Sequence, residues 1–326
     1  MTVLVASSED TAATLSLVVE LSEAGLRVDS FLCRHNLAPS AAAARRAVAA
    51  GVVHIDGKLA KKGHHLVAGE RVDLGDRPVD QAVLSPTPEL SLALLYADDA
   101  LVAVDKPAGI ASHPLHAGES STVASAIIAC FPECAAASPD PREGGLGHRL
   151  DIGTSGVILA ARCREVWHRL REALSGPACE KIYLAETVGR FPTSDEVGKD
   201  FVVPGPRQSS FVVSCPIGRQ GRRGGKVKLD SGRQPLPART EITLVETRAG
   251  STLVEARLSH GRAHQVRAHL AYLGIPVLGD VTYGEPANGG GMDLHLHAGT
   301  ISLLHPITGK PLRIEAPQPT WAVRRG

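Results

Sequence analysis

Aromatic residues are scarce in this sequence, since Phe, Trp and Tyr together make up 3% of its 326 residues. The core must therefore be built from aliphatic side chains, and an RNA reader that stacks bases on exposed aromatic rings is excluded. Long apolar runs are missing too, because none approaches the roughly 20 residues of a membrane-spanning helix. The start, MTVLVASSED, lacks the basic residues of a signal peptide. These absences predict a cytoplasmic protein without a membrane segment.

Disulfide and metal-ligand patterns are absent as well. The six cysteines contain no Cys-x-x-Cys spacing, and a chain of this length needs no disulfide staples, so we expect reduced thiols. Histidines occur in close pairs at His64/His65, His113/His116 and His295/His297. No matching third and fourth ligands stand near any pair, and two histidines at alternate strand positions more often reflect packing. We therefore predict no metal site.

The net charge is only +1, but the charges are unevenly distributed. Residues 1–26 hold four acids and no Lys or Arg, so residues 27–326 carry 35 bases against 30 acids, a net charge of +5. A local excess of positive charge favours an anionic partner such as nucleic acid.

Residues 15–75 have the pattern of a small module. Apolar spacing predicts a short strand from Leu15, a helix within 25–36, and a second helix that Ser40 caps and Gly51 ends. Strands follow around the Asp56-Gly57 turn and over 65–74. The module carries the cations Arg34, Arg45, Arg46, Lys58, Lys61 and Lys62. Taken alone, they fit a solvated helix face as well as an RNA contact.

The order of these elements resembles an S-four-type RNA-binding domain over roughly residues 25–75. The resemblance rests on an R-V-D-x-F-L helix, a Ser-led basic helix, a G-x-V-x-x-[DN]-G turn and a V-x-x-G-[DE]-x-[VI] strand. It implies that the six cations grip an RNA backbone. With the prolines of the next segment, it predicts an N-terminal segment 1–20, an RNA-binding domain 21–77, a linker 78–91 and a catalytic domain 92–326.

The larger domain is predicted to be α+β. Strands are expected at 92–98, 101–109, 155–161, 181–189, 294–304 and 312–317, and helices at 122–130, 165–174 and 262–273. Residues 132–147 form a Pro/Gly-rich loop, and a hairpin turns at Ala249-Gly250. Because strands outnumber helices and short turns join most neighbours, we expect a mixed, mainly antiparallel sheet flanked by helices.

The stretch GHRLDIGTSGVILAAR, residues 147–162, places His148, Arg149 and Asp151 directly before an apolar strand. Taken alone, Asp151 fits a turn cap, an ion pair or a catalytic carboxylate, and a cap is the commonest of the three.

The same stretch resembles the signature H-R-L-D-x-x-T-S-G-x-x-[LV] of the RluA-type RNA pseudouridine synthases. Four more segments agree in order across residues 92–319: YADDALVAVDKPAGIASHP, EKIYLAETVG, GRAHQVRAHLAYLGIPVLGDVTYG and LHLHAGTISLLHPITGKPLRIEAPQP. The resemblance implies the pseudouridine synthase fold and the isomerisation of uridine in RNA to 5-ribosyluracil, with no cofactor. Large-subunit ribosomal RNA is the expected target.

Three catalytic residues follow from this resemblance. Asp151 is the ionised carboxylate beside the sugar and the uracil, and Arg267 is the arginine that pairs with it. Tyr183 lies against the flipped base and is the candidate acceptor of the proton from carbon five. Whether Asp151 attacks the sugar or the base stays open.

A substrate-binding group is expected around these residues: Arg149, His148, Leu296 and His264. Arg149 is placed to enter the RNA stack and fill the gap that the flipped nucleotide leaves. Leu296 is placed beside the uracil, although strand alternation also allows Leu294 or His295 to face inward. The chain departs from the family pattern at Ala263, where Thr is usual, and around VVPGPRQSSF.

Residues 218–228, GRQGRRGGKVK, carry five cations, four glycines and no acid. They fit a solvated flexible loop, or a clamp that orders on RNA phosphates through Arg222, Arg223, Lys226 and Lys228.

Two other functions fit parts of this pattern. A tRNA-directed synthase of the same chemistry has an almost identical sequence pattern. A non-catalytic RNA-binding or ribosome-assembly factor is the alternative from another class, and the intact set of Asp151, Tyr183 and Arg267 counts against it. No sequence feature demands more than a monomer.

Overall fold

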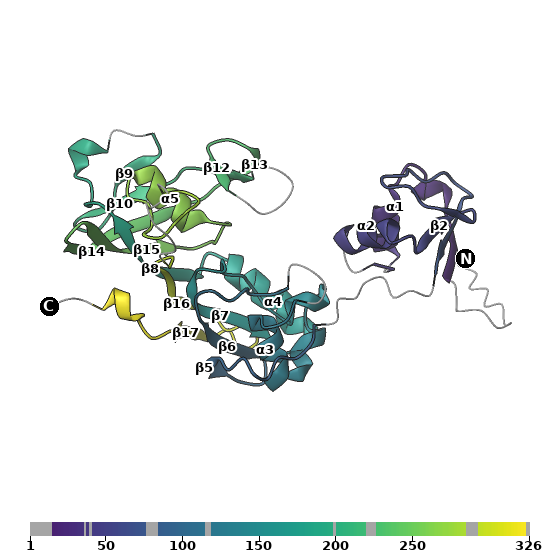
Figure 1. Cartoon of the computed structure of the whole chain (residues 1–326), viewed down its shortest axis with the longest axis horizontal. Helices are drawn as coiled ribbons and strands as arrows, with labels where there is room; N and C mark the ends of the chain where they lie inside the picture. Colours follow the sequence, from purple (N-terminus) through teal and green to yellow (C-terminus); the bar gives the residue numbers. More distant parts are fainter. Residues whose placement is uncertain are drawn as a thin grey trace. The chain divides into compact units, whose positions relative to one another are not determined.

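A computed structural model describes residues 15–35, 37–38, 41–75, 84–114, 119–197, 200–219, 226–284 and 293–323. The chain divides into two compact units. The N-terminal unit contains the described residues up to Gly75, and the C-terminal unit begins at Leu84 (Figure 1). Within the described ranges no helix is long and apolar enough to cross a membrane.

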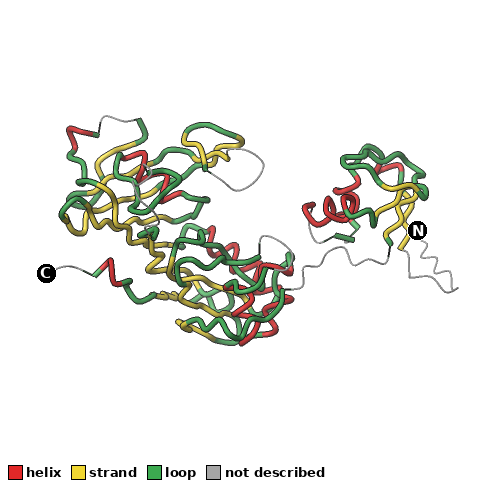
Figure 2. The backbone as a smooth tube through the Cα atoms, viewed as in Figure 1, coloured by secondary structure: helices red, strands yellow, loops and turns green. Residues whose placement is uncertain are grey.

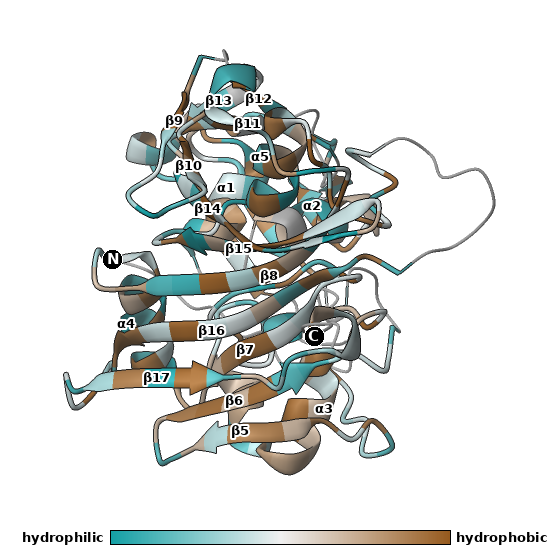
Figure 3. Cartoon of the chain, turned by 90° about the vertical axis from the view of Figure 1, so that its left-hand side faces the viewer, coloured by the Kyte–Doolittle hydropathy of each residue, from teal (hydrophilic) through white to brown (hydrophobic). Residues whose placement is uncertain are grey.

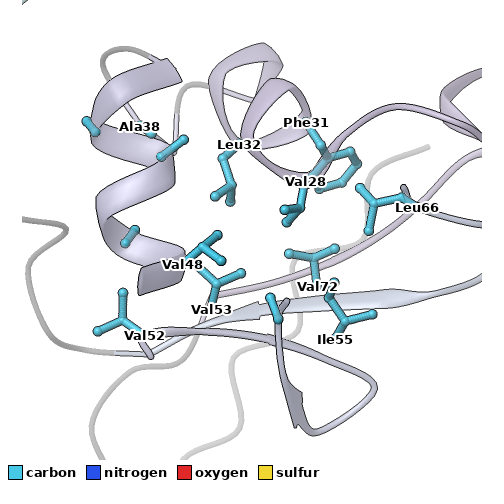
Figure 4. Packing of buried hydrophobic residues seen from close by; sticks show 14 of the residues in the cluster. Val28, Phe31, Leu32, Ala38, Val48, Val52, Val53, Ile55, Leu66 and Val72 are labelled. Atoms are coloured by element: carbon cyan, nitrogen blue, oxygen red, sulfur yellow. The ribbon is translucent and has the colours of Figure 1, made fainter. Parts of the chain in front are cut away.

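The N-terminal unit packs two helices on a small antiparallel sheet. The helices are α1 (Val28–Arg34) and α2 (Ala41–Ala49), and the sheet has the order β1 (Leu15–Val18), β4 (Arg71–Leu74), β2 (Val53–Ile55), β3 (Lys58–Leu59). Phe31 and Leu32 of α1 meet Val53 and Val72 of the sheet in a closed core (Figure 4). The predicted arrangement is therefore confirmed, whereas the predicted cap Ser40 lies outside the described residues.

The C-terminal unit is built on one large sheet (Figure 2). Its strands lie in the order β5 (Ala93–Ala97), β6 (Leu101–Lys106), β7 (Ser155–Ala161), β16 (Leu296–Leu304), β8 (Glu180–Val188), β15 (Ser251–Leu258), β14 (Thr240–Arg248), β10 (Ser210–Val213) and β9 (Val202–Pro204), with β17 (Pro311–Glu315) on β16. The β7 and β16 strands run parallel, and the other pairs between these strands are antiparallel. The mixed, mainly antiparallel sheet is thus confirmed.

Helices cover both faces of this sheet at β6 and β7. One face packs on α3 (Val123–Cys130), and the other packs on α4 (Arg164–Ser175). Six consecutive residues of β7 are buried, and alternate residues of a strand point to opposite faces. Both faces of β7 are therefore covered, and this explains its continuous apolar run. The strands β6 and β7 are correspondingly hydrophobic in Figure 3.

The third helix, α5 (Gln265–Leu273), packs on β14 and β15. It begins three residues later than residue 262, where the sequence predicts its start. The reason is His264, whose φ of 54° is left-handed and therefore lies outside the helix. Gly274, also left-handed at φ 93°, ends the helix as a glycine C-cap does.

The chain also contains shorter elements. A second sheet has the order β12 (Val227–Leu229), β11 (Ile217–Arg219), β13 (Arg233–Leu236), so strands flank the predicted basic loop. Short 3-10 helices occupy Leu21–Glu23, Pro132–Ala136, Pro141–Glu143, Ser194–Glu196 and Thr320–Ala322.

The boundary between the units differs from the predicted one. Leu84 and Thr87, which the sequence places in the linker, are 6% and 8% exposed, and the Thr87 N–H donates to the carbonyl of Ser125 on α3. The catalytic unit therefore begins at Leu84 rather than at residue 92, because an apolar and a polar side chain of this segment are buried on α3.

Candidate active site

Lys106, at the end of β6, donates hydrogen bonds to the backbone of the loop that carries Asp151. The Lys106 ammonium is fully buried and donates to the carbonyl oxygens of Pro107, Ile152 and Thr154 at 3.0, 3.0 and 2.7 Å. Burial lowers the pKa of Lys106 to about 8, and the negative charge of Asp151 opposes this shift. Sequence reasoning missed Lys106, although the family segment VDKPAG contains it.

Arg267 of α5 bridges two carboxylates. Its Nη1 donates to Asp151 Oδ2 at 2.8 Å, while its Nε and Nη2 donate to the two oxygens of Asp280 at 2.7 Å each. Burial alone disfavours the charged guanidinium, but these hydrogen bonds raise the pKa of Arg267 above its usual value. The predicted pair of Asp151 and Arg267 is thus formed across 116 residues of sequence.

Asp280 is the second residue that the sequence analysis missed. Its side chain is fully buried, and Oδ1 also accepts the backbone N–H groups of Thr282 and Tyr283. Burial raises the pKa of Asp280, but the bonds from Arg267 and the backbone outweigh it and lower the pKa overall. Asp280 therefore fixes the guanidinium, whereas Asp151 keeps a side chain that is 30% exposed.

His264 faces the other oxygen of Asp151. Its Nε2 lies 3.7 Å from Asp151 Oδ1, and its Nδ1 lies 3.0 Å from the hydroxyl of Tyr283. That hydroxyl accepts the N–H of Val227, so its own proton is available for Nδ1 and the imidazole proton belongs on Nε2, facing the carboxylate. Burial lowers the pKa of His264, so the ring is neutral at pH 7 and contributes a dipole rather than a charge.

Tyr183 stands on β8 between Ala256 of β15 and Ala298 of β16. Burial, and then the charge of Asp151, raise the pKa of its hydroxyl well above the usual value. The phenol is therefore neutral at physiological pH, and a neutral phenol is a weak proton acceptor. These features favour a contact with the base over the proton-accepting role.

His148 does not supply a cation to the site. Its Nε2 accepts the N–H of Leu159 at 3.1 Å, and the Gly147 N–H donates to the Leu159 carbonyl. Burial, Lys181 and Arg171 lower the pKa of His148 to about 3, so the ring stays neutral. The side chain therefore completes the hydrogen bonding along β7, and the expected substrate-binding role of His148 stays a prediction.

Arg149 is exposed and forms no ion pair within the described part of the chain, as expected for a residue that enters RNA. Leu296 pairs with Ala185, so it shares the face of β8 that carries Tyr183, and it is 4% exposed. His295 points to the opposite face, where it bonds Glu186 and stacks on Trp321. Of Leu294, His295 and Leu296, the three candidates for facing the uracil, His295 therefore lies on the wrong face of the sheet.

The expected RNA-binding cations fall into two groups. In the N-terminal unit, Arg45 pairs with the buried Asp29 at 3.1 Å and Arg34 lies 3.7 Å from the buried Glu23. These two are therefore partly neutralised. No ion pair within the described ranges involves Arg46, Lys58, Lys61 or Lys62.

In the C-terminal unit, the Lys226 ammonium lies 5.4 Å from the ring centre of Tyr283, and the guanidinium carbon of Arg267 lies 5.4 Å from the same ring centre. The basic segment thus reaches the active-site network through Lys226. Lys228 is exposed on β12, and Arg222 and Arg223 lie outside the described residues. In the same described ranges no group of three His, Cys, Asp or Glu side chains could hold a metal ion.

A carboxylate paired with a buried arginine on a large mixed sheet, preceded in the chain by a small basic module, is the arrangement that the resemblance to an RNA-modifying enzyme predicts. Family models agree: "RNA pseudouridylate synthase" matches residues 100–272 and "S4 domain" matches residues 26–73. The chain therefore belongs to the RNA pseudouridine synthase family, and it carries an S4 domain, the S-four-type domain, at its N-terminal side.

Individual relatives cover nearly the whole chain. Ribosomal large subunit pseudouridine synthase D of Xanthomonas campestris pv. campestris is 33% identical over 93% of this chain and 88% of its own length. Ribosomal large subunit pseudouridine synthase C of Salmonella typhimurium is 29% identical over 92% of each chain. Among solved structures, human RNA Pseudouridylate Synthase Domain Containing 4 matches with a TM-score of 0.51 at 25% identity, over 71% of this chain and 90% of that one.

Replacing Lys106 by Met should destabilise the C-terminal unit. Three carbonyl acceptors lose their donor, and a buried unsatisfied group costs roughly 1–3 kcal/mol, so we expect a loss of about 3 kcal/mol and a lower turnover rate. Urea unfolding measures the stability, and the exposed Lys310→Met is the matched control. Wild-type stability and turnover in Lys106→Met would show that the loop needs no such support.

Proposed function

We propose that this chain converts specific uridines of large-subunit ribosomal RNA to pseudouridine in the cytoplasm, with Asp151 as the catalytic carboxylate. The observation that carries the proposal is the network of Asp151, Arg267 and Asp280, in which one oxygen of Asp151 is held at 2.8 Å and the side chain stays partly exposed. The names of the synthase D and synthase C relatives support ribosomal RNA as the target.

The chemistry requires an ionised carboxylate beside the nucleotide. Uracil must be detached from its ribose, rotated, and rejoined through carbon five, which then loses its proton. Arg267 keeps Asp151 ionised and oriented, and Lys106 holds the loop that presents it. Since Asp280 takes two of the three hydrogen bonds from Arg267, part of the negative charge on Asp151 remains available to the substrate.

Neighbouring residues are proposed to bind the RNA and the flipped base. Tyr183 and Leu296 share one face of β8 and β16, where they are placed to lie against the flipped base. Arg149 is placed to fill the gap in the RNA stack. The N-terminal domain, which we place at residues 21–77, supplies binding to the RNA backbone through its unpaired cations.

Mapping pseudouridine in total cellular RNA, with and without the gene for this chain, tests the target. We expect one or more uridines of large-subunit ribosomal RNA to lose their modification when the gene is deleted, and to regain it when the gene is returned. Loss confined to tRNA would overturn the ribosomal assignment. Unchanged modification everywhere would favour the non-catalytic assembly factor.

Replacing Arg222, Arg223, Lys226 and Lys228 together by Ser tests the basic segment. Each lost phosphate contact should reduce the slope of log affinity against log salt by about 0.7–0.9. The slope is measured by RNA binding at several salt concentrations, with the exposed Lys310→Ser as a single-charge control. An unchanged slope would show that the segment is only solvated.

A further inference from the structure

Lys181, at the start of β8, is a buried cation that the mechanism above does not use. It is 5% exposed, and its Nζ makes one hydrogen bond within the described residues, to the carbonyl of Leu174 at 3.1 Å. An ammonium group has three N–H donors, so two of them lack an acceptor in the part of the chain that the structure describes. Lys106, which is also buried, satisfies its ammonium with three carbonyls. This difference indicates that Lys181 has N–H groups available for an acceptor on a ligand.

Two arginines stand near Lys181. Arg171 of α4 uses Nη1 to bind the carbonyl of Gly147, and Arg262 uses Nε to bind that of Pro237 at 3.3 Å. Among the described residues neither arginine forms an ion pair, and neither does Lys181. Burial lowers the pKa of Lys181, the neighbouring Cys179 opposes this shift, and the charges of Arg171 and Arg262 lower the pKa further. Three like charges thus act on one another's surroundings, and no carboxylate of the described residues is paired with any of them.

Such a cluster destabilises the free protein. A buried cation without a counter-charge costs free energy, and like charges close together add to the cost. The nearest acid in sequence, Glu180, points to the opposite face of β8 and pairs with Arg257. Binding sites often carry this kind of destabilising charge because a ligand of opposite charge relieves it.

The cluster lies where the active-site loops begin. Arg171 holds Gly147, the residue before His148, and a Cβ added to Gly147 would collide with Leu170 and Leu174 of α4. On the other side, a Cβ added to Gly261 would lie 3.7 Å from the Lys181 ammonium. The segments leading to Asp151 and to Arg267 therefore both adjoin the cluster.

The position of Lys181 on β8 determines how far its ammonium lies from Tyr183, on which the uracil is proposed to lie. Lys181 and Tyr183 are two residues apart on an unbroken strand, so they share a face and are separated by about 7 Å. That spacing suits a phosphate of the same nucleotide, or of its neighbour, when the uracil lies on Tyr183. The helix α4, which carries Arg171, and the strand β8, which carries Lys181, both belong to the C-terminal unit (Figure 1).

We propose that Arg171, Lys181 and Arg262 form a subsite for one backbone phosphate of the substrate RNA, beside the target uridine. The inference rests on the proposed function, since it assumes that uridine reaches Asp151. A backbone phosphodiester brings one negative charge, shared by two non-bridging oxygens, which can accept N–H groups of these side chains.

Replacing Lys181 by Met in the full chain tests the subsite without turnover. Inorganic phosphate, compared with chloride at equal ionic strength, should raise the Tm of the wild type and of Lys310→Met, and should leave that of Lys181→Met unchanged. Without phosphate, the Tm of Lys181→Met should equal or exceed that of the wild type, because a repulsive charge is removed. A merely structural lysine would instead lower the Tm when replaced.

The second measurement uses a large-subunit ribosomal RNA transcript. Lys181→Met should reduce the slope of log affinity against log salt by about 0.7–0.9, the effect of one phosphate contact, whereas Lys310→Met should not. Phosphate protection that survives in Lys181→Met would overturn the subsite. Lost protection with an unchanged slope would overturn the assignment to RNA. Because both measurements concern binding alone, they are independent of whether Asp151 proves to be catalytic.

Discussion

Asp151→Asn should abolish pseudouridine formation while leaving RNA binding and folding intact. Asn keeps the shape of the side chain and an oxygen that can accept from Arg267 Nη1, but it loses the negative charge that the reaction requires. Arg267 also keeps both bonds to Asp280, so the local structure retains its anchor. We expect the single-turnover rate to fall by several orders of magnitude, as for other essential groups, with a Tm close to that of the wild type.

Single-turnover conversion of a uridine-containing RNA and RNA affinity are measured side by side. The exposed Asp195→Asn, which makes the same chemical change on the surface, is the matched control and should behave as the wild type. Isomerisation by Asp151→Asn at anything near the wild-type rate would mean that Asp151 only caps the turn before β7. In that case the mechanism proposed above is wrong.

A double mutant tests whether Asp151 and Arg267 act together in catalysis. Arg267→Met removes the cation and leaves the buried Asp280 unpaired, so it should cost both activity and stability. Combined with Asp151→Asn, it should reduce activity little further, because the two residues act as one unit.

Asp280→Asn is expected to have the largest effect on stability. It replaces the bidentate carboxylate on the buried guanidinium of Arg267 by a neutral amide and leaves only the partly exposed Asp151 as a charged partner, and breaking a buried pair costs up to about 3–5 kcal/mol. Activity should fall as well, by about 100-fold, because the arginine that orients Asp151 is no longer fixed. Urea unfolding at pH 7 and single-turnover rates measure the two effects, again with Asp195→Asn as the control.

The pH dependence supplies a further readout of Asp280. Folding lowers its pKa, so its contribution to stability is complete above the unfolded value of about 3.9 and is lost as the pH falls through the folded value. The wild type should therefore lose more stability than Asp280→Asn when the pH is lowered from 7 to below 4. Equal losses in the two proteins would show that Asp280 carries no buried charge.

Motifs in the sequence predicted the residues that meet at the site, but not the bonds that hold them. The pairing of Asp151 with Arg267 could be predicted because the HRLD and HQVR segments resemble those of one family. Asp280 and Lys106 lie in segments of the same resemblance, yet nothing in their spacing shows that one anchors Arg267 and the other three carbonyls. The backbone partner of His148 on β7 was not predictable for the same reason.

Local sequence determined the secondary structure where side chains alternate or repeat strongly. The two helices of the N-terminal unit, the run at 155–161 and the hairpin at Ala249-Gly250 all follow from apolar periodicity and turn residues. The start of α5 did not, because the left-handed His264 is held by contacts to Tyr283 and Asp151.

The sequence by itself determined most of the elements and the family, and it predicted Asp151 as the catalytic carboxylate, because these depend on residue types and on their order along the chain. Only the tertiary structure decided which charges are paired. Arg34 and Arg45 meet buried acids, whereas Lys181 lies in the electrostatic field of Arg171 and Arg262 and, among the described residues, none of these three pairs with an acid. The reason is physical: ion pairing depends on distance and burial, which arise when β8, α4 and the loop before α5 pack together.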